Sequence, residues 1–329
     1  MTKFIIKRLL YSAVILVVVM FIVYALMYAM PNNYVEQQAR QLATRPGATK
    51  SYQQWLDDLN KQYGMDENIV SGYFTWVGNA LRGNFGDSWK WSKPVLTEFN
   101  DTVWISFILS LVAFIFELLI AIPLGILAAR KQYQVADYTA TVISMICISL
   151  PTFFLACLLK LVFATKLGWV DFTGMTSRNY PKLSEFGKIL DVGKHMILPA
   201  VTLIIISIGG LMRYTRTNML EVLNADYIRT ARAKGVPEKK VISKHAFRNT
   251  LIPLVTSLGG SLPSLFGGAL ITETLFGIQG IGYASYYSMV EADIPFTMFY
   301  LAFISLLTLL GNLLADILYA VVDPRVRLS

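Results

Sequence analysis

Few side chains in this sequence could support covalent chemistry. The two histidines, His195 and His245, lie far apart in the chain. The two cysteines, Cys147 and Cys157, share one apolar segment, and ten helical residues would separate them by about 15 Å, too far for a disulfide. Neither a nucleophile–base pair nor a zinc site nor a G-x-x-x-x-G-K-(S/T) phosphate loop is visible. We therefore expect no enzyme and no metal or cofactor site in this chain.

One carboxylate stands in the middle of an apolar segment. Glu117 interrupts the run LVAFIFELLI at 111–120. Because a charge in hydrocarbon costs at least about 2.5–3.5 kcal/mol, we expect Glu117 to face the interior of a helix bundle. Two roles are open for it. It either lines a substrate path, where it meets an amino group of the substrate, or makes an interhelical hydrogen bond.

Three further charges lie near the ends of apolar segments. Lys160 is expected to snorkel towards the membrane surface. Glu273 is expected to fix a glycine-containing turn at 273–282 or to help form an outer gate, together with Gly277, Gly280 and Gly282. Asp316 is expected to have a structural role, and we hypothesise that it pairs with Arg213 or Arg216.

A basic loop at 213–250 has more local structure than a simple turn needs. The segment 221–234 suits a short amphipathic helix, Gly235 would end it, and Pro237 would open a second helix. A solvated basic turn or a helix lying on anionic lipid would be simpler interpretations. The small residues Ala231 and Ala233 instead favour insertion into a cleft of another protein.

The elements that must position these residues are membrane-spanning helices. Of the 329 residues 55% are hydrophobic and 15% charged, whereas a soluble domain has about 25% charged residues. The net charge of +8 is explained by orientation in the bilayer rather than by nucleic-acid binding. A span needs about 20 mostly apolar residues. Six segments qualify: 9–30, 102–128, 139–164, 197–218, 251–275 and 296–322. The glycine-rich fifth segment is expected to pack against other helices.

The basic residues predict how the chain is oriented. The N-terminus, the 130s loop, the 213–250 loop and the C-terminus together hold 16 Lys and Arg, and the alternate, longer loops hold 12. Basic residues concentrate on the cytoplasmic side. Both termini are therefore expected in the cytoplasm, which places the 31–101 loop outside.

The first outer loop is too long to be structureless. Ser51 and Gly64 are suitable caps for a helix over 51–63, and residues 67–81 have helical spacing of apolar side chains. We predict a small helical external cap, which either contacts an external partner or forms a lid over the bundle.

Four motifs then resemble one family. ADYIRTARAKG at 225–235, followed by HAFRNTLIP at 245–253, resembles the EAA loop of bacterial ABC importer permeases. GNFGDS at 83–88 and ETLFGIQGIG at 273–282 are similar to motifs of the B-type permease of the oligopeptide/dipeptide family, with Asn84 and Gln279 as departures. The C-terminal DILY at 316–319 and DPR at 323–325 also match, which implies structural roles for Asp323 and Arg325.

This resemblance implies an all-α integral membrane protein with the type I ABC importer permease fold. The chain would then comprise three regions. Residues 1–30 would contain the cytoplasmic N-terminus and the first span, residues 31–101 would form the outer helical region, and residues 102–329 would form a core permease domain with five spans and the cytoplasmic loop 213–250. The 221–235 helix would couple this chain to an ATPase. The coupling residues implied are Glu221, Asp226, Tyr227, Arg229, Thr230, Ala231, Arg232, Ala233, Lys234 and Gly235.

The implied partners are a paralogous second permease, two cytoplasmic ATPases that bind ATP and Mg, and an extracellular substrate-binding protein. The resemblance implies peptide import across the bacterial plasma membrane by alternating access. The same family serves nickel chelates and some sugars, so the cargo stays open. A stand-alone secondary transporter is less well supported, because we see no internal repeat and no buried carboxylates beyond Glu117. A membrane enzyme is disfavoured because catalytic residues are not clustered.

Overall fold

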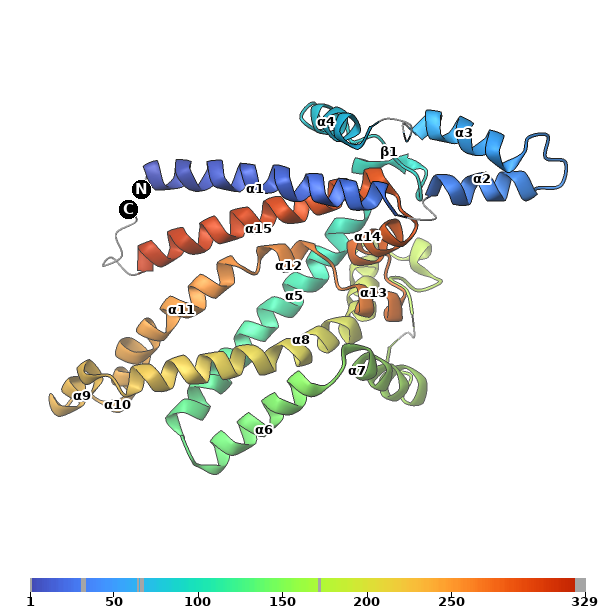
Figure 1. The fold of residues 1–329 in the computed structure, drawn as a ribbon. Helices are drawn as coiled ribbons and strands as arrows, with labels where there is room; N and C mark the ends of the chain where they lie inside the picture. The colour runs from blue at the N-terminus through green and yellow to red at the C-terminus, as the bar shows by residue number, and fades with distance from the viewer. Residues whose placement is uncertain (1, 31–33, 64, 66–67, 171–172, 323–329) are drawn as a thin grey trace. The chain divides into compact units, whose positions relative to one another are not determined.

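The computed structural model describes residues 2–30, 34–63, 65, 68–170 and 173–322, and these are almost entirely helical (Figure 1). Contacts divide the chain into two compact units. The first unit contains residues 1–104 with 281–309, and the second contains residues 105–280 with 310–329.

The first unit combines two spanning helices with the outer loop region. Its elements are α1 (Thr2–Tyr28), α2 (Tyr34–Thr44), α3 (Tyr52–Tyr63), α4 (Ile69–Ala80), β1 (Asp87–Ser88), β2 (Lys93–Pro94), the first turns of α5 (Val95–Arg130), α14 (Ile281–Val290) and the first part of α15 (Ile294–Val322). The two short strands pair antiparallel, with Ser88 opposite Lys93. The core forms where Tyr73 of α4 meets Met20 and Tyr24 of α1 and Met298 of α15.

The two outer helices expected from the sequence are confirmed. Ser51 and Gln54 cap α3 reciprocally, since the Gln54 amide donates to Ser51 Oγ at 3.3 Å and the Ser51 amide donates to Gln54 Oε1 at 2.9 Å. Asn68 caps α4 by accepting from the Val70 amide at 3.0 Å. The helix α2 was not predicted, and it packs on α3 through Val35, Ala39 and Leu59. Gly64 lies outside the described residues.

The second unit contains the remaining helices. They are the rest of α5, α6 (Val135–Ser149), α7 (Thr152–Leu159), the π-helix η1 (Lys160–Lys166), the 3₁₀-helix η2 (Tyr180–Lys182), α8 (Glu185–Leu223), α9 (Asp226–Ala233), α10 (Glu238–Lys240), the π-helix η3 (Val241–Ala246), α11 (Phe247–Gly259), α12 (Leu262–Phe266), α13 (Leu270–Phe276) and the end of α15. The long helix α8 packs on α6, α7, α11 and α13.

The predicted spans have two forms among the described residues. Four helices, α1, α5, α8 and α15, are long and apolar enough to cross a membrane in one piece. Two interrupted pairs, α6 with residues 152–166 and residues 262–276 with α14, bring the number to six when each pair is counted once. The all-α, six-span prediction therefore agrees with this structure.

The predicted third and fifth spans are not single helices. The third bends by 100° between α6 and α7, because Pro151 lacks an amide proton and holds Leu150 in an extended conformation. The fifth, predicted over 251–275, is divided into α11, α12 and α13, with breaks at glycine-containing segments. Gly268 in the second break has a φ of +77°, which a side chain would strain.

Candidate functional site

The helix predicted to couple the chain to an ATPase is α9. It begins at Asp226 rather than at Glu221, which belongs to the last turn of α8. The chain leaves α8 at Asn224, and Ala225 is extended with a ψ of 147°, so α9 starts in a new direction. Gly235 follows α9 with a φ of +72°, as expected for the residue after a helix end. Figure 1 shows α9 and α10 at the end of the long α8.

A small apolar cluster holds α9 in place. Ile228 is completely buried and Ala231 is nearly so. They pack with Met219 of α8 and with residues of α5 and η3, namely Ala129, Val241, Ile242 and Ala246. The interpretation that Ala231 enters a partner's cleft is therefore wrong for this conformation, since its own unit covers it. Sequence spacing could not distinguish the two faces of such a short helix.

The opposite face of α9 is exposed. The exposed residues are Asp226, Tyr227, Arg229, Thr230, Arg232, Ala233 and Lys234. Arg232 braces the turn after α9 by donating from Nε and an Nη to the Glu238 carboxylate at 3.1 and 2.8 Å. This hydrogen-bonded guanidinium lowers the pKa of Glu238. The loop therefore presents a polar, mostly basic surface on a preformed helix.

A second ion pair lies at the base of this loop and was missed by sequence reasoning. Arg216 of α8 makes a two-pronged contact with Asp137 of α6, at 2.6 and 2.8 Å, and Asp137 is only 2% exposed. Arg216 is thus bound to Asp137 rather than to Asp316 in this structure, whereas pairing of Asp316 with Arg213 stays a prediction. Asp316 lies half-buried in α15.

The predicted structural residues Asp323 and Arg325 lie outside the described residues.

The predicted outer turn is organised around Glu273 of α13, which is completely buried. Its carboxylate accepts from Ser106 Oγ at 2.7 Å and from the Ala269 amide at 2.8 Å. After α13, Gly277 adopts a φ of +67° and the Ile278 amide donates to the Glu273 carbonyl at 2.8 Å. A Cβ on Gly280 would stand 2.3 Å from Ser106 Oγ and 2.7 Å from the Glu273 carboxyl group. A side chain at Gly280 is therefore incompatible with this buried contact.

Gly282, the last glycine of the predicted turn, lies buried in α14. Its carbonyl accepts from Ser285 Oγ at 3.2 Å, so it belongs to the helix in this structure.

Lys160 does not snorkel as predicted. It is 8% exposed, and its ammonium group donates to the Leu275 carbonyl and lies 5.4 Å from the centre of the Phe276 ring. The reason is local: the carbonyl at the C-terminal end of α13 is a hydrogen-bond acceptor within reach of η1. Lys160 therefore fastens the end of α13 to the start of η1.

Glu117 is half-buried in α5, and its carboxyl group lies near Ser207 of α8. An open, mostly apolar pocket of 930 Å³ also lies between α5 and α8. Its lining includes Phe116 and Ile120 but not Glu117. Glu117 thus makes an interhelical contact here, and its role on a substrate path stays a prediction.

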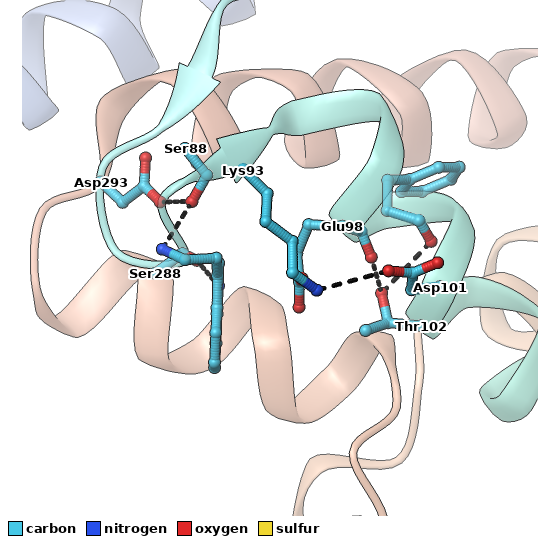
Figure 2. Close-up of polar contacts among 9 residues, drawn as sticks. Ser88, Lys93, Glu98, Asp101, Thr102, Ser288 and Asp293 are labelled. Carbon is cyan, nitrogen blue, oxygen red and sulfur yellow. Dashed lines mark hydrogen bonds and ion pairs between the residues drawn. The ribbon is translucent and has the colours of Figure 1, made fainter.

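The motif at 83–88 meets the start of α15 within the first unit (Figure 2). Ser88 Oγ donates to Asp293 Oδ2 at 2.5 Å, and both side chains are essentially inaccessible. Asp293 also accepts from the amides of Lys90 and Phe296, each at 3.2 Å. Trp91 Nε1 donates to Ser288 Oγ of α14 at 3.0 Å. We call Ser88, Trp91, Ser288 and Asp293 the Ser88–Asp293 corner.

Asp293 is a functional candidate that sequence reasoning missed. It precedes the apolar run of α15 and accepts from the amide of Phe296, three residues later, as an N-cap residue does. That position was the signal that could have identified it. Asp293 lies outside the spans, and its burial raises the pKa of the carboxyl group despite the hydrogen bonds.

Similarity to known proteins extends over nearly the whole chain. Residues 121–328 match the family described as "Binding-protein-dependent transport system inner membrane component", and residues 1–102 match its N-terminal family. This chain belongs to that family. It is therefore an inner-membrane component of a binding-protein-dependent transport system.

Several curated relatives of this permease match over almost their whole length. The oligopeptide transport system permease protein AppB of Bacillus subtilis is 37% identical, over 99% of this chain and 100% of the relative. The dipeptide transport system permease protein DppB of Alkalihalophilus pseudofirmus is 31% identical over the same shares. OppB of Mycobacterium tuberculosis, an oligopeptide permease protein, is 32% identical over 100% of both chains. The chain is thus similar to B-type permease subunits.

A solved structure supports the fold. An inward-facing form of the MetNI methionine ABC transporter aligns with a TM-score of 0.53 at 17% identity, over 69% of this permease and 97% of that chain. At this identity the likeness concerns the fold alone. The permease therefore has the type I ABC importer fold that its motifs implied.

Proposed function

We propose that this permease is one of two membrane subunits of an ATP-driven importer that moves di- or oligopeptides into the cytoplasm. The relatives named above are oligopeptide and dipeptide permease proteins, and their similarity covers the chain from end to end. The proposed partners are a paralogous second permease, two ATPase subunits that bind ATP and Mg, and an extracellular binding protein that delivers the peptide.

The observation that carries the proposal is the construction of the α9 loop. Ile228 and Ala231 fasten α9 to its own unit, whereas Tyr227, Arg229 and Lys234 face outwards. A helix that is anchored on one face and exposed on the other can transmit a push from an ATPase to α8 and η3. We infer that the exposed face of α9 sits in a groove of the ATPase and that ATP-driven closure moves it.

The coupling role can be tested by co-purification of the assembled complex. Replacing Ala233 with Arg adds bulk and charge to the exposed face of α9 and should reduce recovery of the ATPase subunits. A matched control, Ala48→Arg, makes the same change at an exposed position between α2 and α3 and should leave recovery intact. Equal recovery from both variants would exclude α9 as the ATPase contact.

Transport assays separate the remaining alternatives. In proteoliposomes, import by the complete complex should require ATP, whereas a stand-alone secondary transporter would import with this chain alone. ATPase stimulation by the binding protein loaded with a dipeptide, a longer peptide, a nickel chelate or a saccharide should identify the cargo class. Stimulation only by a chelate or a saccharide would refute the peptide assignment while leaving the importer role intact.

A further inference from the structure

The helix α4 differs from the rest of the outer loop region in composition. No charged residue occurs between Asn68 and Arg82. Its exposed residues include apolar Val70, at 49%, and Phe74, at 62%, and Leu81, which follows the helix, is 84% exposed. The neighbouring helix α3 instead presents Gln53, Asp57 and Lys61 outwards. The outward surface of α3 is therefore compatible with aqueous solvent, whereas the outward apolar residues of α4 are compatible with an apolar environment.

Contacts with α1 fix the depth at which α4 lies. Tyr73 Oη donates to the Val17 carbonyl at 2.8 Å, and the Tyr73 ring lies 5.3 Å from that of Phe21 and 5.8 Å from that of Tyr24. The apolar stretch of α1 ends at Tyr28. At 1.5 Å per residue, Tyr24, Phe21 and Val17 lie about 6, 10 and 16 Å inside that end. The helix α4 thus packs beside the span rather than beyond it.

The close approach of the two helices depends on Gly72. A Cβ at this position would stand 2.5 Å from Tyr24 Oη, so a side chain there would displace α4 from α1. In Figure 1 α4 is drawn nearly end-on where α1 lies lengthwise, so the two axes cross. A helix that crosses a span at this depth lies in the plane of the membrane within the outer leaflet, as in-plane helices do.

A groove of 380 Å³ runs between α1, α4 and α15 within the same unit. Its apolar lining includes Leu16, Met20, Val77, Leu81, Phe303 and Leu306. The groove is continuous with α1 and α15, two candidate membrane spans whose apolar residues are largely not buried within the protein. Because it contains aliphatic and aromatic surface at the depth of the spans, a hydrocarbon chain matches its chemistry.

We propose that α4 is an in-plane helix embedded in the outer leaflet and that the groove beside it binds an acyl chain of a phospholipid. The predicted external cap is then formed by α2 and α3, and α4 anchors it to the membrane. Coverage of α4 by a second protein subunit is the competing arrangement. The proposal rests on the membrane-spanning nature of the chain and not on its cargo.

Depth-dependent fluorescence quenching tests the position of α4. A fluorophore would be attached at Phe74→Cys or at the control Gln53→Cys of α3, in full-length protein with Cys147→Ala and Cys157→Ala, reconstituted with its complex in phosphatidylcholine nanodiscs. Lipids brominated near the headgroup should quench the label at position 74 about twofold more than the label at 53, and aqueous iodide should do the reverse. Equal iodide quenching at both positions, or no quenching of position 74 by either agent, overturns the proposal.

A second measurement tests the groove itself. Ala302→Trp fills the groove from α15, whereas Ala13→Trp adds the same ring to an exposed position of α1. Native mass spectrometry of the complex after mild delipidation should show about one phospholipid fewer for Ala302→Trp and no change for Ala13→Trp. Thermal unfolding of both variants would establish that they are folded. Unchanged phospholipid retention by a folded Ala302→Trp variant contradicts acyl-chain binding.

Discussion

The Ser88–Asp293 corner and the α9 loop solve the same problem, the fixing of a chain reversal, with opposite chemistry. In the corner, buried Asp293 accepts hydrogen bonds from a hydroxyl group and from backbone amides. In the α9 loop, the polar contact between Arg232 and Glu238 is exposed, and a small apolar cluster around Ile228 provides the packing.

The difference separates a rigid region from one whose polar contacts can be exchanged, as the proposed ATPase contact of α9 requires. A buried carboxylate with several donors is costly to disturb, since each donor would lose its partner without gaining water. An exposed ion pair contributes little to stability and can be exchanged for contacts with another protein. We therefore expect perturbation of the corner to affect the stability of the chain, and perturbation of α9 to affect chiefly the loop and its coupling.

The largest effect is expected from truncation of Asp293. Asp293→Ala leaves Ser88 Oγ and the amides of Lys90 and Phe296 buried without this acceptor, which should lower the free energy of unfolding by about 3 kcal/mol. Thermal unfolding of the purified chain in nanodiscs measures this. Asp87→Ala, at the exposed neighbouring carboxylate, should change stability by less than about 0.5 kcal/mol.

If Asp293→Ala does not fold, Asp293→Asn retains an acceptor of the same size and should give an intermediate loss. If both Asp293 variants were as stable as the wild type, the Ser88–Asp293 corner would not contribute more to global stability than the α9 loop does.

A smaller and more local effect is expected from the core of the α9 loop. Ile228→Ala should cost about 2 kcal/mol through loss of buried surface and an incompletely filled cavity. Because the cluster joins α9 only to the adjoining ends of α5, α8 and η3, the loss should appear as faster amide hydrogen exchange over residues 226–233, with little change in global unfolding. Tyr227→Ala, on the exposed face, should leave this protection unchanged. Uniformly faster exchange throughout the second unit would show that α9 is not an independent element.

The fold was largely predictable because membrane spans are encoded by the length of apolar segments. The start of α3 was equally predictable, since Ser51 acts through Gln54, a residue nearby in sequence. The broken spans were not predicted, because proline and glycine are common within membrane helices and Pro151 or Gly268 alone does not reveal a break.

The candidate sites were predictable only in part. A contiguous motif located the α9 loop, yet it did not reveal that Ala231 faces inwards. Asp293 and Ser88 are 205 residues apart, and Arg216 and Asp137 are 79 apart. A single sequence contains no sign of such pairings, because the tertiary fold decides which carboxylate meets which donor.

Acid should affect the two regions in opposite directions. The pKa of Asp293 is raised by burial, so its contribution to folding is fully present below the unfolded value of about 3.9 and is lost as pH rises through the folded value. The pKa of Glu238 is lowered by Arg232, so its contribution is present above about 4.3 and is lost as pH falls through the folded value.

Thermal unfolding and α9 hydrogen exchange, each followed between neutral pH and the carboxylate range, test this contrast. Asp293→Asn should remove the acid-side gain in global stability, and Glu238→Gln should remove the acid-side loss of α9 protection. These effects should be smaller than that of Asp293→Ala, because the ionised carboxylate keeps its hydrogen bonds. An acid-dependent loss of global stability that disappears in Asp293→Asn would reverse the assignment of the raised pKa.

The smallest effect is expected from the exposed pair. Arg232 and Glu238 have 43% and 53% exposed side chains, so Arg232→Ala should cost less than about 1 kcal/mol of α9 stability, and salt should reduce this further. A double-mutant cycle with Glu238→Ala isolates the pair.

The matched comparison is Arg216→Ala, which leaves Asp137 buried without its guanidinium and should cost about 3 kcal/mol. Because both pairs have the same two-pronged geometry, equal losses would mean that burial does not explain the difference between rigid and exchangeable contacts.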